Sequence, residues 1–175
     1  MLRTMSEEHQ STVRFVQDGA VGTVTLDSPP LNLIGQQLIS DLLAAFDQVD
    51  AAQGLRALVL QGEGNVFSAG ARVVGMGGDL HAAEEFAAWG VIDRVVARAE
   101  LRNAATEFAQ RLAAGPTHAF SVVKDLVRAY TTAGVMGADS LLTDAAVGLF
   151  DTEDARRGIE SFLTSGPGHA TFAGR

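Results

Sequence analysis

The strand-forming segments of this chain all precede residues 65–80, and all but one of its helical patterns follow them. The sequence of this dividing stretch is NVFSAGARVVGMGGDL. A fully alternating α/β fold would need more strands and more crossover helices, because only one helical pattern lies between strand-forming segments. We therefore expect an α/β chain in two parts, an N-terminal β-β-α-β unit followed by a helical C-terminal half.

Three short segments near the N-terminus are typical of strands. Residues 13–17 and 21–26 are rich in β-branched side chains and flank Asp18-Gly19, a pair that favours a hairpin turn. Residues 55–62 form a nearly continuous apolar run, which predicts a strand covered on both faces. Between them, residues 35–52 predict a helix, because apolar residues recur there at helical spacing: Leu38, Leu42, Ala45, Phe46 and Val49.

The C-terminal part is dominated by helical spacing of apolar residues. Asp79 could cap the first helix, and Gly115-Pro116 ends the second. We expect helices over residues 81–90, 99–114, from Thr117 onward, 135–150 and 152–164. The third of these helices carries an apolar stripe that predicts an inward face: Phe120, Val123, Val127 and Tyr130.

Composition restricts the environment and the partners of the chain. With 175 residues, 47% of them hydrophobic, it has the size and apolar content of one globular domain, expected over residues 12–175 behind a flexible tail at 1–11. The absence of cysteine excludes disulfides and thiolate chemistry and fits a cytoplasmic setting. No signal peptide or continuous apolar run of membrane-spanning length is evident. A net charge of −8 disfavours nucleic acid and anionic membranes as partners.

Several familiar chemistries fit residues 65–80 poorly. Gly75-Met76-Gly77-Gly78 satisfies only part of a dinucleotide fingerprint, because Leu80 occupies its last small-residue position. Ser68 lacks the glycine at position 66 that a nucleophile elbow requires, and the histidines are scattered. No histidine pair has metal-ligand spacing, so we expect no metal. Carboxylates such as Glu84 and Glu85 lie at a helix start, where they complement the helix dipole.

The main chain of this stretch offers another kind of site. A buried strand, a glycine loop and the small residues of Phe67-Ser68-Ala69-Gly70-Ala71 can direct main-chain N–H groups toward one point. Such groups stabilise the oxyanion of a thioester enolate without any catalytic side chain. Small residues are needed because the acyl ligand must approach the main chain closely.

Three segments resemble the enoyl-CoA hydratase/isomerase (crotonase) family. LDSPPLNLIGQQLISDLLAAFDQVDAAQGLRALVLQGEGNVFSAG resembles its N-terminal part, in which an apolar strand leads through G-x-G to F-S-A-G-A-D. ARVVGMGGDLHAAEEFAAWGVIDRVV resembles a later segment that contains A-E-E-A and G-L-V-D-x-V-V. DTEDARRGIESFLTSGPGHATFAGR resembles the C-terminal helix and tail. The resemblance implies a truncated crotonase-like fold whose central portion is missing between Gly70 and Arg72.

The resemblance also implies where a ligand would bind. Ala71 matches the residue whose N–H forms half of the oxyanion hole, and a coenzyme A thioester is the implied substrate or ligand, with no further cofactor. Ser68, Ala69 and Gly70 would line the site, and Arg72 could contact the phosphates of coenzyme A. In the C-terminal part the implied ligand-binding residues are Phe162 and His169. The second oxyanion glycine and the catalytic glutamates have no match here.

Three interpretations remain open on the sequence alone. The chain could be an enzyme of fatty acid metabolism, a lyase that adds water to a 2-enoyl-CoA with impaired catalysis. It could be a non-catalytic relative that binds acyl-CoA or joins a trimer with an intact paralogue. It could also be an internally deleted gene product without a function of its own. The family resemblance implies a trimer or hexamer in the first two cases.

Overall fold

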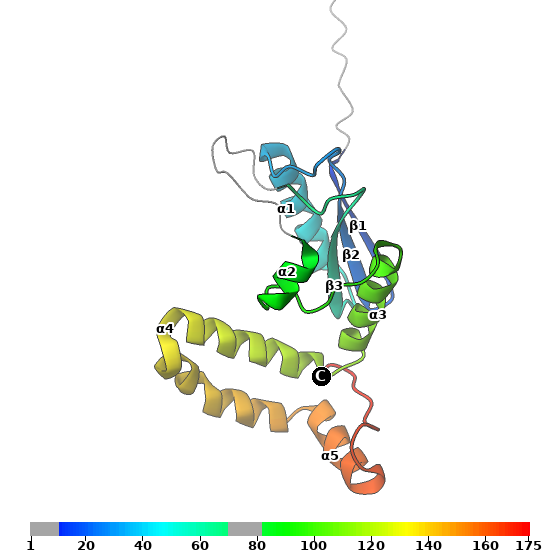
Figure 1. Ribbon diagram of the computed structural model, residues 1–175. Helices are drawn as coiled ribbons and strands as arrows, with labels where there is room; N and C mark the ends of the chain where they lie inside the picture. Colours follow the sequence, from blue (N-terminus) through cyan, green and yellow to red (C-terminus); the bar gives the residue numbers. More distant parts are fainter. Residues whose placement is uncertain (1–10, 70–81) are drawn as a thin grey trace, which may run out of the picture. The chain divides into compact units, whose positions relative to one another are not determined.

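The computed structural model describes residues 11–69 and 82–175. The chain forms two compact units, one that ends at Thr106 and a second that spans Glu107–Arg175. Figure 1 labels the strands and α-helices, which are β1 (Val13–Asp18), β2 (Val21–Leu26), α1 (Gln36–Ala51), β3 (Ala57–Gly62), α2 (Ala83–Ala88), α3 (Leu101–Ala113), α4 (Thr117–Phe150) and α5 (Glu153–Ser165). A short 3-10 helix, η1 (Arg98–Glu100), precedes α3. The predicted order of β-β-α-β followed by helices is confirmed.

The first unit contains a three-stranded sheet in the order β1-β2-β3. β1 and β2 form the predicted antiparallel hairpin, and β2 and β3 are parallel because α1 forms the crossover between them. Gly22 on β2 has no room for a side chain, since an added Cβ would lie 2.8 Å from the Phe15 ring and 2.9 Å from a Leu55 methyl group. A larger residue at this position would therefore have to displace the side chains of Phe15 and Leu55.

The core of the first unit lies between α1 and the hairpin. It consists of Val13, Val24, Leu26, Leu38 and Ala45. Asp41 on the same helix accepts hydrogen bonds from the main-chain N–H and the hydroxyl of Thr12, at 2.7 and 2.8 Å. Apolar contacts and these two charge-assisted hydrogen bonds thus hold α1 against the start of β1.

The prediction that both faces of the third strand are covered is wrong. Leu58 and Leu60 of β3 keep 38% and 42% of their surface exposed. The cause is the position of α1, which contacts β1 and β2. The continuous apolar run in the sequence indicates a strand correctly, but the cover that such a run normally receives is not present in the described part of the chain.

The second unit is built around α4. Gly134 has φ 65° and ψ −159°, a conformation that ends one helical arm and starts the next. This confirms the predicted separation into one helix from Thr117 and another over 135–150. By length and composition α4 could cross a membrane, although Gly134 divides it into two arms.

The expected inward stripe on the first arm of α4 is also wrong. Val123, Val127 and Tyr130 are each 56% exposed, and no residue of α4 is buried. Within the second unit α5 is the element that contacts α4, and a single short helix cannot cover a face of this length. The apolar stripe is therefore present on the helix, but no element of the second unit covers it.

Candidate functional site

A buried asparagine organises the loop between β2 and α1. Asn32 is 2% exposed and adopts φ 48°, a conformation that asparagine tolerates better than most residues. Its side-chain oxygen accepts the N–H of Ser28 at 2.8 Å. Its side-chain nitrogen donates to the carbonyl oxygens of Glu63 at 3.1 Å and Val66 at 2.9 Å. One side chain thus joins this loop to the loop that follows β3.

The loop after β3 is held closely against the end of its own strand. A Cβ at Gly62 would lie 2.7 Å from the Cα and carbonyl oxygen of Phe67 and from the carbonyl oxygen of Val66. Gly64 turns the chain with φ 82°. The G-x-G pattern in the sequence therefore has two separate causes, close main-chain approach at the first glycine and a left-handed turn at the second.

Ser68 and Ala69, which precede the predicted oxyanion position, also bond to the loop between β2 and α1. The Ser68 hydroxyl donates to the carbonyl oxygen of Asn32 at 2.8 Å, and the Ala69 N–H donates to that of Leu31 at 2.9 Å. Ser68 and Ala69, both predicted to contact the substrate, thus form hydrogen bonds within the protein. Their contact with a ligand stays a prediction.

The remaining predicted residues of this stretch lie outside the described residues. They are the predicted oxyanion donor Ala71, its neighbours Gly70 and Arg72, and the glycine cluster at 75–78. The described scaffold ends at Ala69, two residues before Ala71. The chain is therefore anchored by hydrogen bonds directly before the position where the resemblance implies an oxyanion donor.

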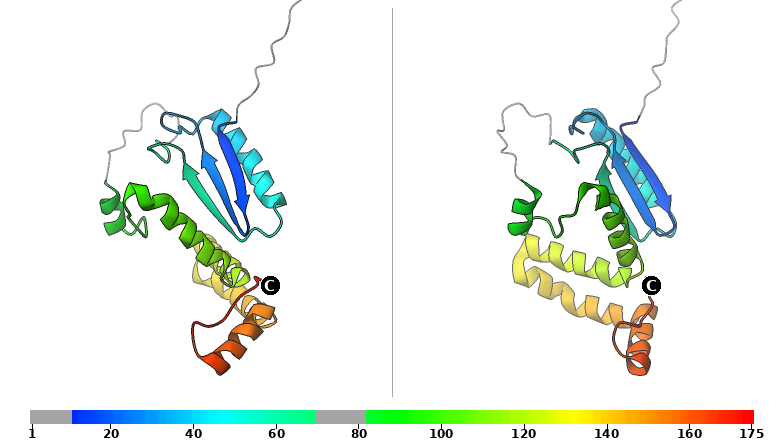
Figure 2. Two further views of the ribbon diagram at one scale, coloured as in Figure 1. Left: turned by 90° about the vertical axis from the view of Figure 1, so that its right-hand side faces the viewer. Right: turned by 45° about the vertical axis from the view of Figure 1, so that its right-hand side comes forward.

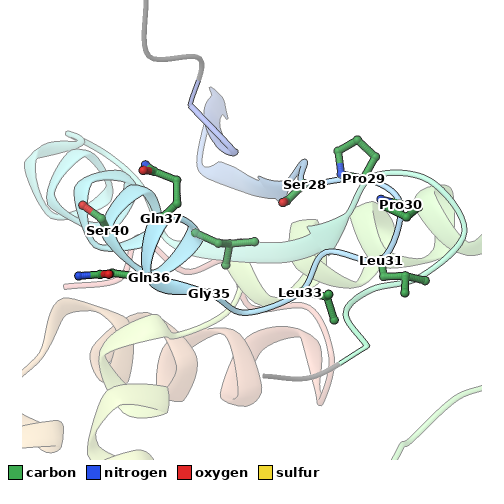
Figure 3. Close-up of a pocket in the computed structure, with 10 residues that line it drawn as sticks. Ser28, Pro29, Pro30, Leu31, Leu33, Gly35, Gln36, Gln37 and Ser40 are labelled. Carbon is green, nitrogen blue, oxygen red and sulfur yellow. The ribbon is translucent and has the colours of Figure 1, made fainter. Parts of the chain in front are cut away.

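A pocket of about 670 Å³ adjoins this anchor (Figure 3). Leu31 lines it and also accepts the N–H of Ala69. The described residues of its wall combine apolar side chains with amide and hydroxyl groups, and none of them is charged: Ser28, Pro29, Pro30, Leu31, Leu33, Gly35, Gln36, Gln37, Leu38 and Ser40. Such a lining suits a neutral, amide-containing chain better than a phosphate.

The acidic residues at the start of α2 have the structural role that the sequence predicts. Glu84 and Glu85 lie in the first turn of α2, where carboxylates favour the positive end of the helix dipole. The Glu85 carboxylate also accepts the N–H of Ala82 at 2.9 Å. No group of three acidic or histidine side chains that could hold a metal ion occurs among the residues described.

The tail that follows α5 folds back onto the start of that helix. The Asp154 carboxylate accepts the N–H groups of Ala173 and Gly174 at 2.6 and 2.7 Å, and its own N–H donates to the carbonyl oxygen of Arg175 at 2.9 Å. Arg175 also donates to Glu153 at 2.8 Å, and this bond lowers the pKa of the Glu153 carboxyl group. Phe162 and His169, the predicted ligand-binding residues of this part, are exposed.

Sequence reasoning did not identify Asn32 as part of the site. The available signal was its position after Pro29-Pro30, where a turn needs a residue that accepts positive φ. Its partners lie 31 and 34 residues further along the chain. Because this separation leaves no local pattern, the sequence does not reveal the connection.

Comparison with known proteins agrees with the family resemblance. The sequence model described as Enoyl-CoA hydratase/isomerase matches residues 17–81 and, as a second segment, residues 71–169. A probable enoyl-CoA hydratase of Bacillus subtilis is 30% identical over 63 residues, which are 36% of this chain and 24% of that protein. The chain thus spans about a quarter of the length of this curated relative.

Solved structures show the same fold. A probable enoyl-CoA hydratase/isomerase from Mycobacterium abscessus superposes with a TM-score of 0.79 at 19% identity, covering 94% of this chain and 99% of that one. An enoyl-CoA hydratase from Mycobacterium tuberculosis H37Rv gives 0.79 at 15% identity, covering 95% and 100%. The crotonase-like α/β fold predicted from the resemblance is confirmed.

Proposed function

Because the chain belongs to the enoyl-CoA hydratase/isomerase family, we propose that it binds acyl-CoA thioesters and hydrates 2-enoyl-CoA at a strongly reduced rate. The thioester oxygen would accept a hydrogen bond from the main-chain N–H of Ala71. The observation that carries this proposal is the Asn32 network. The Asn32 side chain donates to Glu63 and Val66, and its loop accepts the bonds of Ser68 and Ala69, so that the chain is held up to Ala69.

Fixing the main chain matters because an oxyanion hole works by preorganisation. N–H groups that already point at the developing charge need no reorganisation during the reaction. The Ser68 and Ala69 bonds to the Asn32 loop hold the approach to position 71 in the same way. The neutral pocket beside Leu31 could receive the amide-containing arm of coenzyme A, since its wall offers both apolar surface and amide groups.

The reduced rate follows from the groups that this chain lacks. Neither the second oxyanion donor nor the proton-transferring glutamates of the family have a match in the sequence. Each such group contributes about 10²- to 10⁴-fold to a rate, so their combined loss leaves binding as the main activity. Glu85 is an unsuitable replacement, because its carboxylate caps α2.

A second candidate is a non-catalytic subunit that assembles with an intact relative. The observation in its favour is α4, whose apolar residues are exposed over both arms. This candidate and the first both fit a cytoplasmic homo-oligomer or mixed trimer that needs no cofactor beyond the coenzyme A ligand. They differ in whether the chain by itself binds acyl-CoA.

A matched pair of variants at position 71 tests the first candidate. Ala71→Pro removes the main-chain N–H, whereas Ala71→Gly keeps it. Titration of each purified chain with a short acyl-CoA should show loss of binding in Ala71→Pro and retained binding in Ala71→Gly. Equal binding by both variants, with unchanged circular dichroism, would contradict the proposed oxyanion donor.

A further inference from the structure

No strand pairs with the outer side of β3 in the described part of the chain, although residues 59–62 line a pocket together with Arg98 and Leu101 from η1 and the start of α3. β2 pairs with one side of β3, and no strand lies beyond it within residues 11–69 and 82–175, as Figure 2 shows. The N–H groups of Ala57 and Glu63 donate toward β2, to Ala20 at 3.1 Å and Leu26 at 2.8 Å. Main-chain groups alternate between the two sides of a strand, so those of Leu58 and Leu60 point to the open edge.

The same two residues extend the apolar face of the sheet. Leu60 pairs in register with Val24, so both side chains lie on the face that α1 covers. Val24 is fully buried, whereas Leu58 and Leu60 lie beyond the reach of α1 and stay partly exposed. The edge of β3 therefore presents two outward main-chain residues together with two leucine side chains.

β3 lacks the features that normally prevent an edge strand from pairing. Such strands usually carry charged side chains, a proline or a bulge. The sequence of β3 is ALVLQG, which contains none of these residue types, and its pairing with β2 is regular. The outward N–H and C=O groups have the spacing of a strand, so another extended strand can pair with them.

The strand is also complementary to its own reverse. Leu58 and Leu60 lie one residue before and one residue after Val59. When two copies of β3 run antiparallel with Val59 opposite Val59, each Leu58 faces a Leu60 of the other copy. This register puts four leucines in two cross-strand pairs. The outward N–H and C=O groups of Leu58 in one copy then face those of Leu60 in the other.

The neighbouring register is less favourable. With Leu60 opposite Leu60, each Leu58 would face Gly62 of the other copy. That register therefore contains one leucine pair, whereas the pairing centred on Val59 contains two.

We propose that a second copy of this chain completes the sheet through an antiparallel β3–β3 pair centred on Val59. The two-fold axis is perpendicular to the sheet, so one continuous six-stranded sheet forms, with an α1 helix on each half of the same face. The leucine pairs fill the surface between the two α1 helices. This inference is independent of acyl-CoA binding.

A single cysteine tests the register directly in the full chain. Val59 opposite Val59 is a non-hydrogen-bonded pair, whose Cα atoms lie about 4.5 Å apart in a regular sheet, close enough for a disulfide. The chain has no cysteine of its own, so Val59→Cys should give a covalent dimer under mild oxidation. Leu43→Cys, at an exposed position of α1, is the control. Equal crosslinking of the two variants would overturn the register.

Sedimentation equilibrium tests the interface without a crosslink. The unmodified chain should dimerise, and Leu58→Lys combined with Leu60→Lys should raise the dissociation constant about tenfold or more, because like charges would face each other. Leu60→Pro should also weaken the dimer, since it removes an outward N–H but no bond to β2. Leu43→Lys should change nothing. A chain that is monomeric throughout, or edge variants that associate like the unmodified chain while circular dichroism shows them folded, would overturn the proposal.

Discussion

The side-chain nitrogen of Asn32 lies 2.9 Å from the carbonyl oxygen of Val66, 34 residues further along the chain. This bond and its partner to Glu63 cross from the loop before α1 to the loop after β3. The Ser68 hydroxyl adds a third bond between the two loops by donating to the Asn32 carbonyl oxygen. Asn32 is therefore the residue on which the geometry near the proposed oxyanion position depends most.

Replacing Asn32 tests this dependence. Asn32→Ala leaves the Ser28 N–H and the carbonyl oxygens of Glu63 and Val66 without their partner, which should cost about 1–3 kcal/mol of stability. It also places alanine at positive φ, a conformation it adopts unfavourably. Urea unfolding followed by circular dichroism measures the loss, and acyl-CoA titration should show weaker binding.

Asn32→Gly and Asn32→Asp separate the two causes. Glycine accepts the positive φ but loses all three hydrogen bonds, whereas aspartate can still accept the N–H of Ser28 but turns a carboxylate oxygen toward the carbonyl oxygens of Glu63 and Val66. We expect all three variants to be destabilised, with glycine affected least because it alone accepts the positive φ without adding a charge. A variant series as stable as the unmodified chain would show that the network is dispensable.

Gly62 should tolerate no side chain. In Gly62→Ala the new methyl group would meet the main chain of Val66 and Phe67 at 2.7 Å, so the loop must shift. We expect a loss of about 1–3 kcal/mol, as in other overpacked sites, together with weaker acyl-CoA binding. Gly148→Ala is the matched control, because nothing lies within 4 Å of its added Cβ and alanine favours a helix. Equal stability of the two variants would contradict the close packing seen here.

The interruption of α4 should depend on Gly134. Its φ of 65° and ψ of −159° belong to a region that is almost restricted to glycine. Gly134→Ala should therefore cost about 1–3 kcal/mol, or straighten the helix. Thermal unfolding measures the first effect and helical content by circular dichroism the second. No change in either would show that the two arms do not require this conformation.

Tail attachment should weaken in acid. The hydrogen bond from Arg175 lowers the pKa of Glu153 below its usual 4.5, so the unfolded carboxyl group protonates before the folded one. The stabilisation is complete above the unfolded pKa and is lost as pH falls through the folded value. The protection factors of the Ala173 and Gly174 amides, which correct for the slower intrinsic exchange in acid, should fall over that range.

Glu153→Gln serves to assign this acid response. It removes the charge that pairs with Arg175 and Arg157, so the tail amides should exchange faster already at neutral pH. Glu160→Gln, an exposed change on the same helix, should leave their exchange unaltered. Identical exchange in the Glu153 and Glu160 variants would mean that Asp154 alone holds the tail.

The sequence predicts local elements of this chain well, because their signals are local. Asp18-Gly19 marks the hairpin, apolar spacing marks α1, and Thr152 caps α5 by accepting the N–H of Ala155 at 3.1 Å. The exposure of a side chain is harder to predict, because Val127 and Leu60 lie in apolar patterns that are typical of buried residues. Whether they are buried depends on which distant segment covers them. The role of Asn32 is hidden for the same reason.

The most direct test of the central claim is hydration of a short 2-enoyl-CoA by the purified, monodisperse chain, followed as loss of the conjugated thioester absorbance. We predict that the chain binds acyl-CoA but turns over about 10⁴-fold or more below an intact family enzyme assayed in parallel, because at least two contributing groups are missing. Turnover that matches the intact enzyme would contradict the account, and its loss in Glu84→Gln or Glu85→Gln would identify a replacement acid.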